Sequence, residues 1–118
     1  MIVKQEKVDK PWGHEVIWSK CEKFVGKILC INKGHRLSRQ YHVKKEETIF
    51  VLTGTLLLEI GMGETLQRID LKQGQAFHVV PNTVHRFCAD YGDVELAEVS
   101  TPELDDVVRL EDDYDRSK

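Results

Sequence analysis

The sequence has few cysteines, and they form no recognisable pattern. Among 118 residues there are three (Cys21, Cys30 and Cys88), with no CxxC pair. Their odd number and wide spacing argue against a disulfide framework and indicate reduced thiols in a cytoplasmic protein. Cys30 and Cys88 lie in apolar, strand-like runs, where a free thiol usually acts as a small hydrophobe. A catalytic cysteine stays an alternative only.

The chain also lacks the signatures of membrane and nucleic-acid binding. No apolar stretch approaches the ~20 residues that span a bilayer, and the start, MIVKQEKVDKPWG, has no apolar signal-peptide core. The net charge of −3 and the pI of about 5.9 give no support to nucleic-acid binding, which favours a basic face. With 41% apolar and 31% charged residues, we expect one soluble globular domain spanning residues 1–118.

Strand signals dominate the chain. About nine short segments rich in β-branched and apolar residues are separated by turn residues at spacings near ten residues. This pattern predicts an all-β barrel or sandwich. Thr53-Gly54, between two apolar runs, predicts a tight hairpin turn in which glycine supplies the positive φ. In the tail, Leu104, Val107 and Val108 have helical spacing and predict one short helical turn.

Alternation of side chains along a strand assigns the polar residues to faces. In the segment RLSRQYH, one face would carry Arg36, Ser38, Gln40 and His42, and the other would carry Leu37, Arg39 and Tyr41. A strand face with four polar residues fits the wall of a cavity better than a core. The second set is therefore expected to point away from the cavity. A one-residue bulge would invert this assignment.

Two carboxylates fall on faces that are otherwise apolar. Glu47 shares its face with Ile49 and Val51, and Glu98 shares its face with Leu96. A carboxylate on an apolar face is costly unless it is paired or bound to a cation.

A divalent metal is the cation that the pattern favours. Three short segments can bring together two neutral imidazoles, an amide oxygen and a carboxylate, from Gln40, His42, Glu47 and His85. This set suits one divalent transition metal, with zinc expected first and manganese, cobalt and nickel as alternatives. Three other histidines have no comparable partners and are expected to be structural or exposed: His14, His35 and His78.

The segments GHRLSRQYHVKKEETIFVLTG and GQAFHVVPNTVH resemble the two motifs of the cupin superfamily, with Gln40 where the first histidine usually stands. Together with KPWG and VVRLEDDYDR, they are similar to the type II phosphomannose isomerase (mannose-6-phosphate isomerase) cupin domain, from Asp9 to Arg116. The departures are Asp115 in place of a glycine, Arg39 in place of an apolar residue, and Asn82-Thr83 after the proline. These 118 residues carry no guanylyltransferase domain, so nucleotide-sugar synthesis is not expected.

The resemblance implies a double-stranded β-helix, the cupin or jelly-roll barrel, and a role for each matched residue. It implies metal ligation by Gln40, His42, Glu47 and His85. Arg109 matches the arginine of the family's C-terminal motif and is implied in catalysis. Lys27, Arg36 and Ser38 are assigned to substrate binding.

The leading interpretation is a metal-dependent aldose–ketose isomerase of the mannose-6-phosphate/fructose-6-phosphate type. Glu98 is the candidate base, because it shares a buried face and is not needed as a ligand. A non-catalytic metal- and sugar-binding cupin module is one alternative. An iron dioxygenase is another, against which the amide ligand at Gln40 argues. The expected partners are a sugar or sugar phosphate and a second copy of the chain in a homodimer.

Overall fold

Two antiparallel sheets form the protein, a computed structural model that describes residues 1–116. The larger sheet contains β1 (Glu6–Lys10), β2 (Gly13–Lys20), β3 (Val25–Ile31), β5 (Glu47–Thr53), β8 (Ala76–Val79) and β10 (Val94–Ser100). The smaller sheet contains β4 (Arg39–Tyr41), β6 (Thr55–Ile60), β7 (Gln67–Lys72), β9 (His85–Cys88) and β11 (Val108–Glu111). One 3-10 turn, η1 (Gly63–Thr65), lies between β6 and β7.

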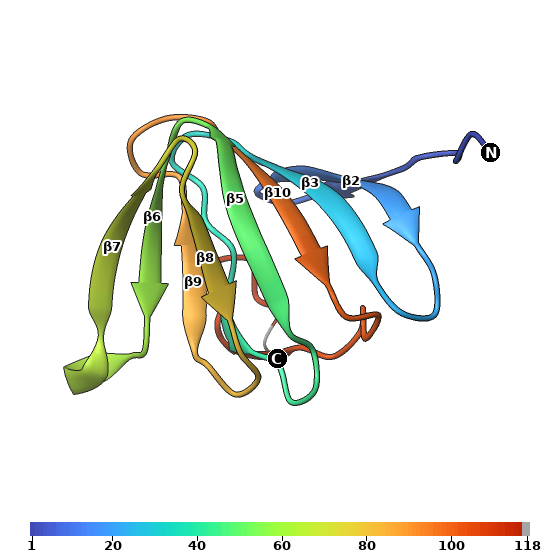
Figure 1. Ribbon diagram of the computed structural model, residues 1–118. Helices are drawn as coiled ribbons and strands as arrows, with labels where there is room; N and C mark the ends of the chain where they lie inside the picture. Colours follow the sequence, from blue (N-terminus) through green and yellow to red (C-terminus); the bar gives the residue numbers. More distant parts are fainter. Residues whose placement is uncertain (117–118) are drawn as a thin grey trace.

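The strand orders are β1-β2-β3-β10-β5-β8 and β11-β4-β9-β6-β7, so each sheet interleaves strands that are distant in the sequence. In Figure 1 the strands of both sheets diverge from the top of the view, and the red C-terminal segment crosses between them at their lower ends. This architecture confirms the predicted all-β barrel or sandwich. Within residues 1–116, no helix has the length and apolar character needed to cross a membrane.

The inner faces of the sheets change from apolar to polar along the strands. In β10 alternate residues are buried, beginning with Val94 and Leu96 and ending with Glu98 and Ser100. The neighbouring β5 runs in the opposite direction and begins with Glu47, which pairs with Ser100. The polar ends of the two strands therefore coincide, and the inward orientation predicted for both carboxylates is confirmed.

An apolar cluster fills the rest of the interior. It contains Trp12, Leu29, Ile31, Ile49, Val51, Leu56, Leu58, Leu71, Phe87, Ala89, Val94 and Leu96. Fully burying a side chain of the Leu, Ile or Phe type contributes roughly 1.5–3 kcal/mol. This cluster therefore supplies the stability that offsets the burial of charged groups at the other end.

The chain passes from one sheet to the other at Gly54. β5 and β6, on either side of it, belong to different sheets, so the predicted hairpin is wrong. The predicted positive φ is confirmed at 83°. A Cβ atom at this position would lie 2.4 Å from the Asp93 carbonyl oxygen. Glycine is needed here for a corner packed against backbone, which alternation of apolar runs alone cannot distinguish from a hairpin.

A bulge precedes β4. Arg36 bridges to Cys88, and Gln40 pairs with His85, so four residue steps on one strand face three on the other. The extra residue shifts the alternation by one. Leu37, predicted to point away, lines the cavity, whereas Arg36, predicted to point in, does not. Beyond the bulge the prediction holds, because Gln40 and His42 line the cavity and Arg39 and Tyr41 do not.

The predicted helical turn in the tail is also wrong. The only helix in residues 1–116 is η1, and residues 101–107 form turns that lead into β11. Short-range hydrogen bonds run from Leu104 N–H to Pro102 and from Val107 N–H to Asp105, two residues back. Such bonds belong to tight turns rather than to a helix.

Candidate metal site and cavity

Three polar atoms converge at one point between the sheets. His42 follows β4, Glu47 begins β5, and His85 begins β9. The Oε1 atom of Glu47 lies 3.3 Å from His85 Nε2 and 3.6 Å from His42 Nε2. All three side chains are buried, and within residues 1–116 none of the three atoms has a hydrogen-bond partner. Unpartnered buried polar atoms are costly, so this arrangement fits a cation bound between them.

Backbone carbonyls orient both histidine rings. His42 Nδ1–H donates to the Asp106 carbonyl oxygen at 2.6 Å, and His85 Nδ1–H donates to the Thr83 carbonyl oxygen at 2.8 Å. A carbonyl oxygen can only accept, so Nδ1 carries a proton in each ring. In the neutral rings each Nε2 then keeps its lone pair for a ligand. This is how carbonyl partners fix the rings of metal-binding histidines. His42, Glu47 and His85 thus form a possible metal site.

Gln40 lies beside this site. It pairs with His85 between β4 and β9, so the two side chains share a face of the sheet. Its Oε1 accepts a hydrogen bond from the Ser38 hydroxyl at 2.6 Å. An amide oxygen has a second lone pair, which leaves Gln40 able to act as a fourth ligand. Ser38 is buried and does not line the cavity, so its observed contact is with Gln40.

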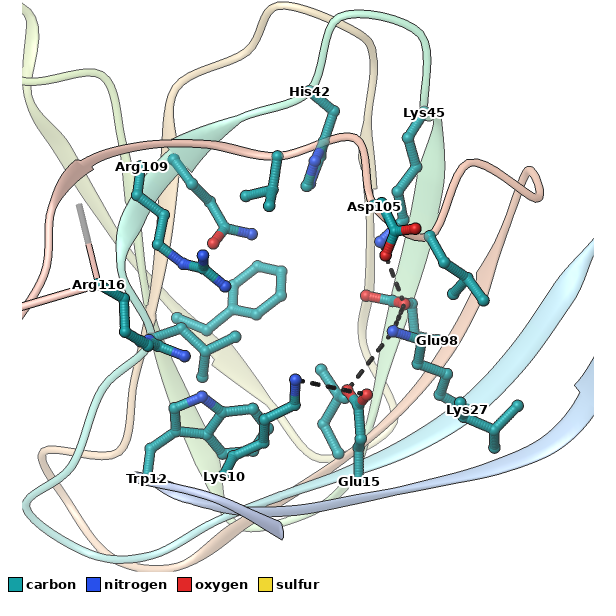
Figure 2. Close-up of a pocket in the computed structure, with 17 residues that line it drawn as sticks. Lys10, Trp12, Glu15, Lys27, His42, Lys45, Glu98, Asp105, Arg109 and Arg116 are labelled. Carbon is teal, nitrogen blue, oxygen red and sulfur yellow. Dashed lines mark hydrogen bonds and ion pairs between the residues drawn. The ribbon is translucent and has the colours of Figure 1, made fainter. Parts of the chain in front are cut away.

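A cavity of about 250 Å³ lies beside this site, and of the three converging residues His42 lines it. Both sheets and the C-terminal segment contribute to its walls. In Figure 2 a first wall carries Trp12, Arg109 and Arg116, and a second wall carries Lys27, Lys45, Glu98 and Asp105. His42 lies at the top of the view, and Lys10 and Glu15 meet at the bottom.

Ion pairs run along the second wall. Lys45 Nζ lies 3.1 Å from Glu47 Oε2 and 3.6 Å from Glu98 Oε2. Lys27 Nζ lies 4.0 Å from Glu98 Oε2 and 3.4 Å from Glu15 Oε2. All five side chains are buried. Each charge has an opposite charge beside it, which is the condition for keeping charges in a low-dielectric interior.

The two carboxylates nearest the possible metal site have opposite pKa shifts. Burial, followed by the negative charge of Glu47, raises the pKa of Glu98 to about 8. Burial also opposes ionisation of Glu47, but the neighbouring imidazoles of His42 and His85 and the charge of Lys45 outweigh it. The pKa of Glu47 is therefore well below its ordinary value. Carboxyl groups whose pKa values are pushed apart are typical of acid–base sites.

The pKa of Glu98 predicts a pH-dependent stability for the metal-free protein. In the folded protein the pKa of Glu98 is about 8, whereas its ordinary value is 4.5. The contribution of protonated Glu98 to the free energy of unfolding is then fully present below pH 4.5 and is lost as the pH rises through 8. Glu98→Gln mimics the protonated form, so its free energy of unfolding should fall less over this range. Urea unfolding in the presence of a chelator measures both.

The control for this prediction is Glu22→Gln, which changes an exposed glutamate on the turn between β2 and β3. Its unfolding free energy should follow the wild-type pH dependence. An identical pH dependence for the Glu98→Gln variant and the wild type would show that Glu98 ionises normally in the folded protein.

The first wall is cationic and less neutralised. Arg109 on β11 pairs with Gln40 on β4, which places it two strands from His85. Among the described residues it forms no ion pair, and its buried Nε atom has no hydrogen-bond partner. Arg116 is engaged by Asp112 at 2.9 Å, and Lys10 lies 3.9 Å from Glu15. Within residues 1–116, Arg109 is therefore the cavity cation with no ion pair, and it can meet an anionic group of a ligand.

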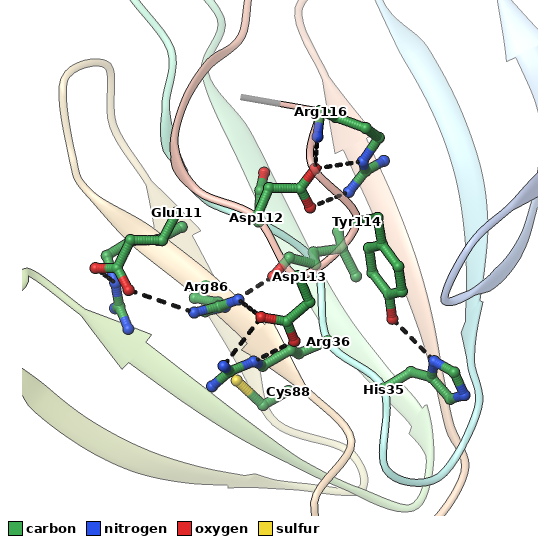
Figure 3. Close-up of polar contacts among 12 residues, drawn as sticks. His35, Arg36, Arg86, Cys88, Glu111, Asp112, Asp113, Tyr114 and Arg116 are labelled. Carbon is green, nitrogen blue, oxygen red and sulfur yellow. Dashed lines mark hydrogen bonds and ion pairs between the residues drawn. The ribbon is translucent and has the colours of Figure 1, made fainter. Parts of the chain in front are cut away.

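A cluster of arginines and carboxylates holds the C-terminal segment that carries Arg109 (Figure 3). Arg86 is fully buried and donates to the Leu37 carbonyl oxygen at 2.8 Å and to Asp113 at 3.0 Å. Arg36 donates to the same carboxylate at 2.7 Å. The observed contact of Arg36, a predicted substrate-binding residue, is thus with the tail rather than with the cavity. Lys27 does line the cavity.

The position of Asp115 explains a departure from the expected motif. Its φ of 60° lies in the left-handed region, which glycine adopts most easily. Aspartate is one of the few other residues that tolerate this conformation. The tail therefore follows a path for which glycine is suited, although the side chain differs.

Several cavity residues were missed by the sequence reasoning: Lys10, Trp12, Glu15, Lys45 and Arg116. Glu15 carried a signal, because it stands two residues before the apolar Ile17 on one strand and alternation places both on the inward face. The signal for Lys10, Trp12 and Arg116 would have been their place in the KPWG and DDYDR segments. Lys45 lies in the loop before β5, where alternation does not apply.

The remaining histidines and cysteines lie elsewhere. His35 bonds to Tyr114, and His78 bonds to Thr48 and Glu46, and neither histidine lines the cavity. All three cysteines are free. Burial, followed by Glu59 and Asp90, raises the pKa of Cys88 to about 12, which makes this thiol a poor nucleophile.

Comparison with known proteins gives one family. The family described as mannose-6-phosphate isomerase C-terminal matches residues 2–112. No curated protein matches the chain.

Solved structures share the fold at low sequence identity. KdgF from Halomonas sp. is 19% identical with a TM-score of 0.73, over 85% of this chain and 90% of that chain. The nucleoside dehydratase Pac13 of Streptomyces is 16% identical with a TM-score of 0.74, over 95% of this chain and 89% of that chain. CapF from Staphylococcus aureus, a capsular polysaccharide assembling protein, is 13% identical with a TM-score of 0.74; the match covers 92% of this chain and 34% of CapF. The predicted cupin fold is confirmed.

Proposed function

Because the chain belongs to the mannose-6-phosphate isomerase C-terminal family of cupins, we propose that it is a metal-dependent isomerase of the mannose-6-phosphate/fructose-6-phosphate type. The observation that carries this proposal is the convergence of three unpartnered buried atoms, from His42, Glu47 and His85, beside a cavity that Arg109 lines. A cation site and an anion-binding group then face the same small space.

The proposed metal ligands are these three residues and Gln40. Two imidazoles, a carboxylate and an amide oxygen suit zinc, which we propose first, or manganese, cobalt or nickel. When bound, the metal would polarise oxygens of the sugar. The cavity volume of about 250 Å³ supports a single small sugar rather than a larger ligand.

Glu98 is proposed as the group that moves the proton. In the open-chain sugar it would remove the proton on C2, which leaves an enediolate, and would return the proton to C1 while the hydroxyl proton passes from O2 to O1. A pKa of about 8 makes its carboxylate a stronger base than an ordinary glutamate. Lys45 Nζ lies 3.6 Å from Glu98 Oε2 and would stabilise the negative charge of the enediolate.

Arg109 is proposed to bind the phosphate or the enediolate, and Lys27 to bind the sugar. Arg36 and Ser38 were expected to bind substrate as well. Their observed partners, Asp113 and Gln40, give them supporting positions instead. The homodimer and the cytoplasmic location stay predictions.

One observation favours the alternative, a binding module without turnover. The carboxylate of Glu98 is flanked by two lysines, Lys45 at 3.6 Å and Lys27 at 4.0 Å. In this alternative the two lysines hold the carboxylate in ion pairs, and substrate binds in the cavity without reacting.

The decisive experiment is metal analysis of protein purified without chelator, followed by assays with hexose phosphates. Turnover of mannose 6-phosphate that depends on the metal supports the isomerase. Metal and sugar binding without turnover supports the binding module. Iron in the purified protein, with oxygen uptake, supports a dioxygenase, for which two histidines and one carboxylate are the usual ligands.

A further inference from the structure

A short loop carries much of the proposed site. Residues 43–46 connect His42 to Glu47, so two proposed metal ligands bracket the loop. Lys45, which contacts both Glu47 and Glu98, lies within it. The convergence of these groups therefore depends on how the loop is held.

A single aspartate from the tail holds this loop. Asp106 Oδ1 accepts the Val43 N–H at 3.0 Å, and Oδ2 accepts the Lys44 N–H at 2.6 Å and the Lys45 N–H at 2.9 Å. The main-chain carbonyl of the same residue accepts His42 Nδ1–H at 2.6 Å. Asp106 thus contacts four consecutive residues, three through its carboxylate and one through its backbone.

The contact between tail and loop has a second point. The Glu46 N–H donates to Thr101 Oγ1, and the Thr101 N–H donates to the Glu46 carbonyl oxygen, each at 3.0 Å. The loop is therefore tied to residues 101–106 along its length. Residues on both sides of Asp106, namely Asp105, Val107 and Arg109, line the cavity.

We propose that Asp106 is a positioning residue for the metal site: its carboxylate fixes loop 43–45, and its carbonyl holds His42 with Nε2 directed at Glu47. The proposal rests on the metal site proposed above. It assigns to the tail a role in forming the site, in addition to covering the cavity. Asp106 itself offers no atom to the metal in this arrangement.

The carboxylate matters because three donors point at it. A carboxylate accepts at both oxygens, whereas an asparagine amide accepts at one and presents N–H groups to the other donors. Asp106→Asn should therefore lose the contacts of one oxygen, and Asp106→Ala should lose all three. In both variants the main-chain carbonyl remains, but the loop that presents His42 to it is released.

The test is Zn²⁺ affinity, measured by competition with a chelator for wild type, Asp106→Ala and Asp106→Asn. We expect Asp106→Ala to bind about 10–100-fold more weakly, the usual effect of losing a partner that orients ligands. Asp106→Asn should bind with intermediate affinity. With Co²⁺ as the probe, the visible absorption spectrum should also change, because it reports the geometry of the ligands.

The matched control is Asp93→Ala. Asp93 Oδ1 accepts the Lys33 N–H at 2.7 Å, so it also joins two distant segments through a carboxylate, but it does not line the cavity. Thermal unfolding of the metal-free variants compares the structural cost of the two changes. The proposal is overturned if Asp106→Ala binds Zn²⁺ as tightly as wild type, or if Asp93→Ala loses affinity to the same extent.

A second measurement separates this proposal from the metal site itself. In metal-free protein, ¹⁵N NMR of the His42 ring should show a single Nδ1–H tautomer in the wild type and a mixture in Asp106→Ala. The amides of residues 43–45 should lose protection from hydrogen exchange in the variant. If the wild type binds neither Zn²⁺ nor Co²⁺, the proposed metal site is wrong. Separately, if the His42 tautomer and the hydrogen-exchange protection of residues 43–45 are the same in Asp106→Ala and the wild type, the role of Asp106 is overturned.

Discussion

Replacing His85 with alanine is expected to remove most of the bound metal. Its Nε2 atom lies 3.3 Å from Glu47 Oε1, is buried, and has no partner in residues 1–116. The variant would keep Gln40, His42 and Glu47, one ligand short of the four that a tetrahedral site needs. We expect Zn²⁺ affinity to fall by more than about 100-fold, the upper end of what losing an outer-shell partner costs. Metal content per chain and chelator competition measure the loss.

His78→Ala provides the matched control. This histidine is exposed on β8 and bonds to Thr48 and Glu46, outside the cavity. Its removal changes the number of imidazoles by one and should leave metal content at one ion per chain. Equal metal content in the His85→Ala variant and the wild type would show that the proposed ligand set is wrong.

The orientation of Glu47 and Glu98 could be predicted from the sequence because β5 and β10 pair without interruption from Val51 and Leu96 to these residues, and both strands are paired on both sides. Each strand has a hydrogen-bonded neighbour on either edge, so side chains alternate along this stretch and one face assignment serves Glu47 to Val51 and Leu96 to Glu98. The sequence also predicted that three short segments bring Gln40, His42, Glu47 and His85 together, and the structure places the ligand atoms of His42, Glu47 and His85 close to one another.

Alternation failed where the backbone departs from a regular strand. The bulge between Arg36 and Gln40 can be recognised only from the pairing of this segment with β9. The sequence alone does not say which strand is the partner. The tail failed for a related reason. Leu104 and Val107 have helical spacing, but they line a cavity rather than pack as one face of a helix.

The ion pairs along the cavity wall depend on strand order rather than on local sequence. Lys27 and Glu98 are far apart in the chain and become neighbours because β3 pairs with β10 in a register that aligns them. Likewise, Asp106 reaches residues 43–45 only because the tail folds back between the sheets. Contacts of this kind follow from topology, so residue patterns within one segment carry no sign of them.

Replacing Arg109 with alanine is expected to lower turnover of mannose 6-phosphate by about 100-fold or more. Isomerisation needs a polarised oxygen, a proton carrier and a cation for the phosphate or the enediolate. Among the cavity cations, Arg109 alone forms no ion pair within the described residues and lies one strand from Gln40. Losing one charged stabiliser of this kind commonly costs about 3 kcal/mol of transition-state stabilisation. The measurement is the turnover rate of the metal-reconstituted wild type and variant.

Folding and metal binding should survive this change, because no ion pair in residues 1–116 and none of the proposed ligands involves Arg109. The matched control is Arg68→Ala, which removes an exposed guanidinium that pairs with Glu59 outside the cavity. Its turnover should equal that of the wild type. Equal rates for the Arg109→Ala variant and the wild type would remove Arg109 from the mechanism. If the wild type turned over no hexose phosphate while still binding metal and sugar, the isomerase proposal would fail and the binding module would replace it. The role of Arg109 would then be measured by the affinity of the Arg109→Ala variant for sugar phosphate.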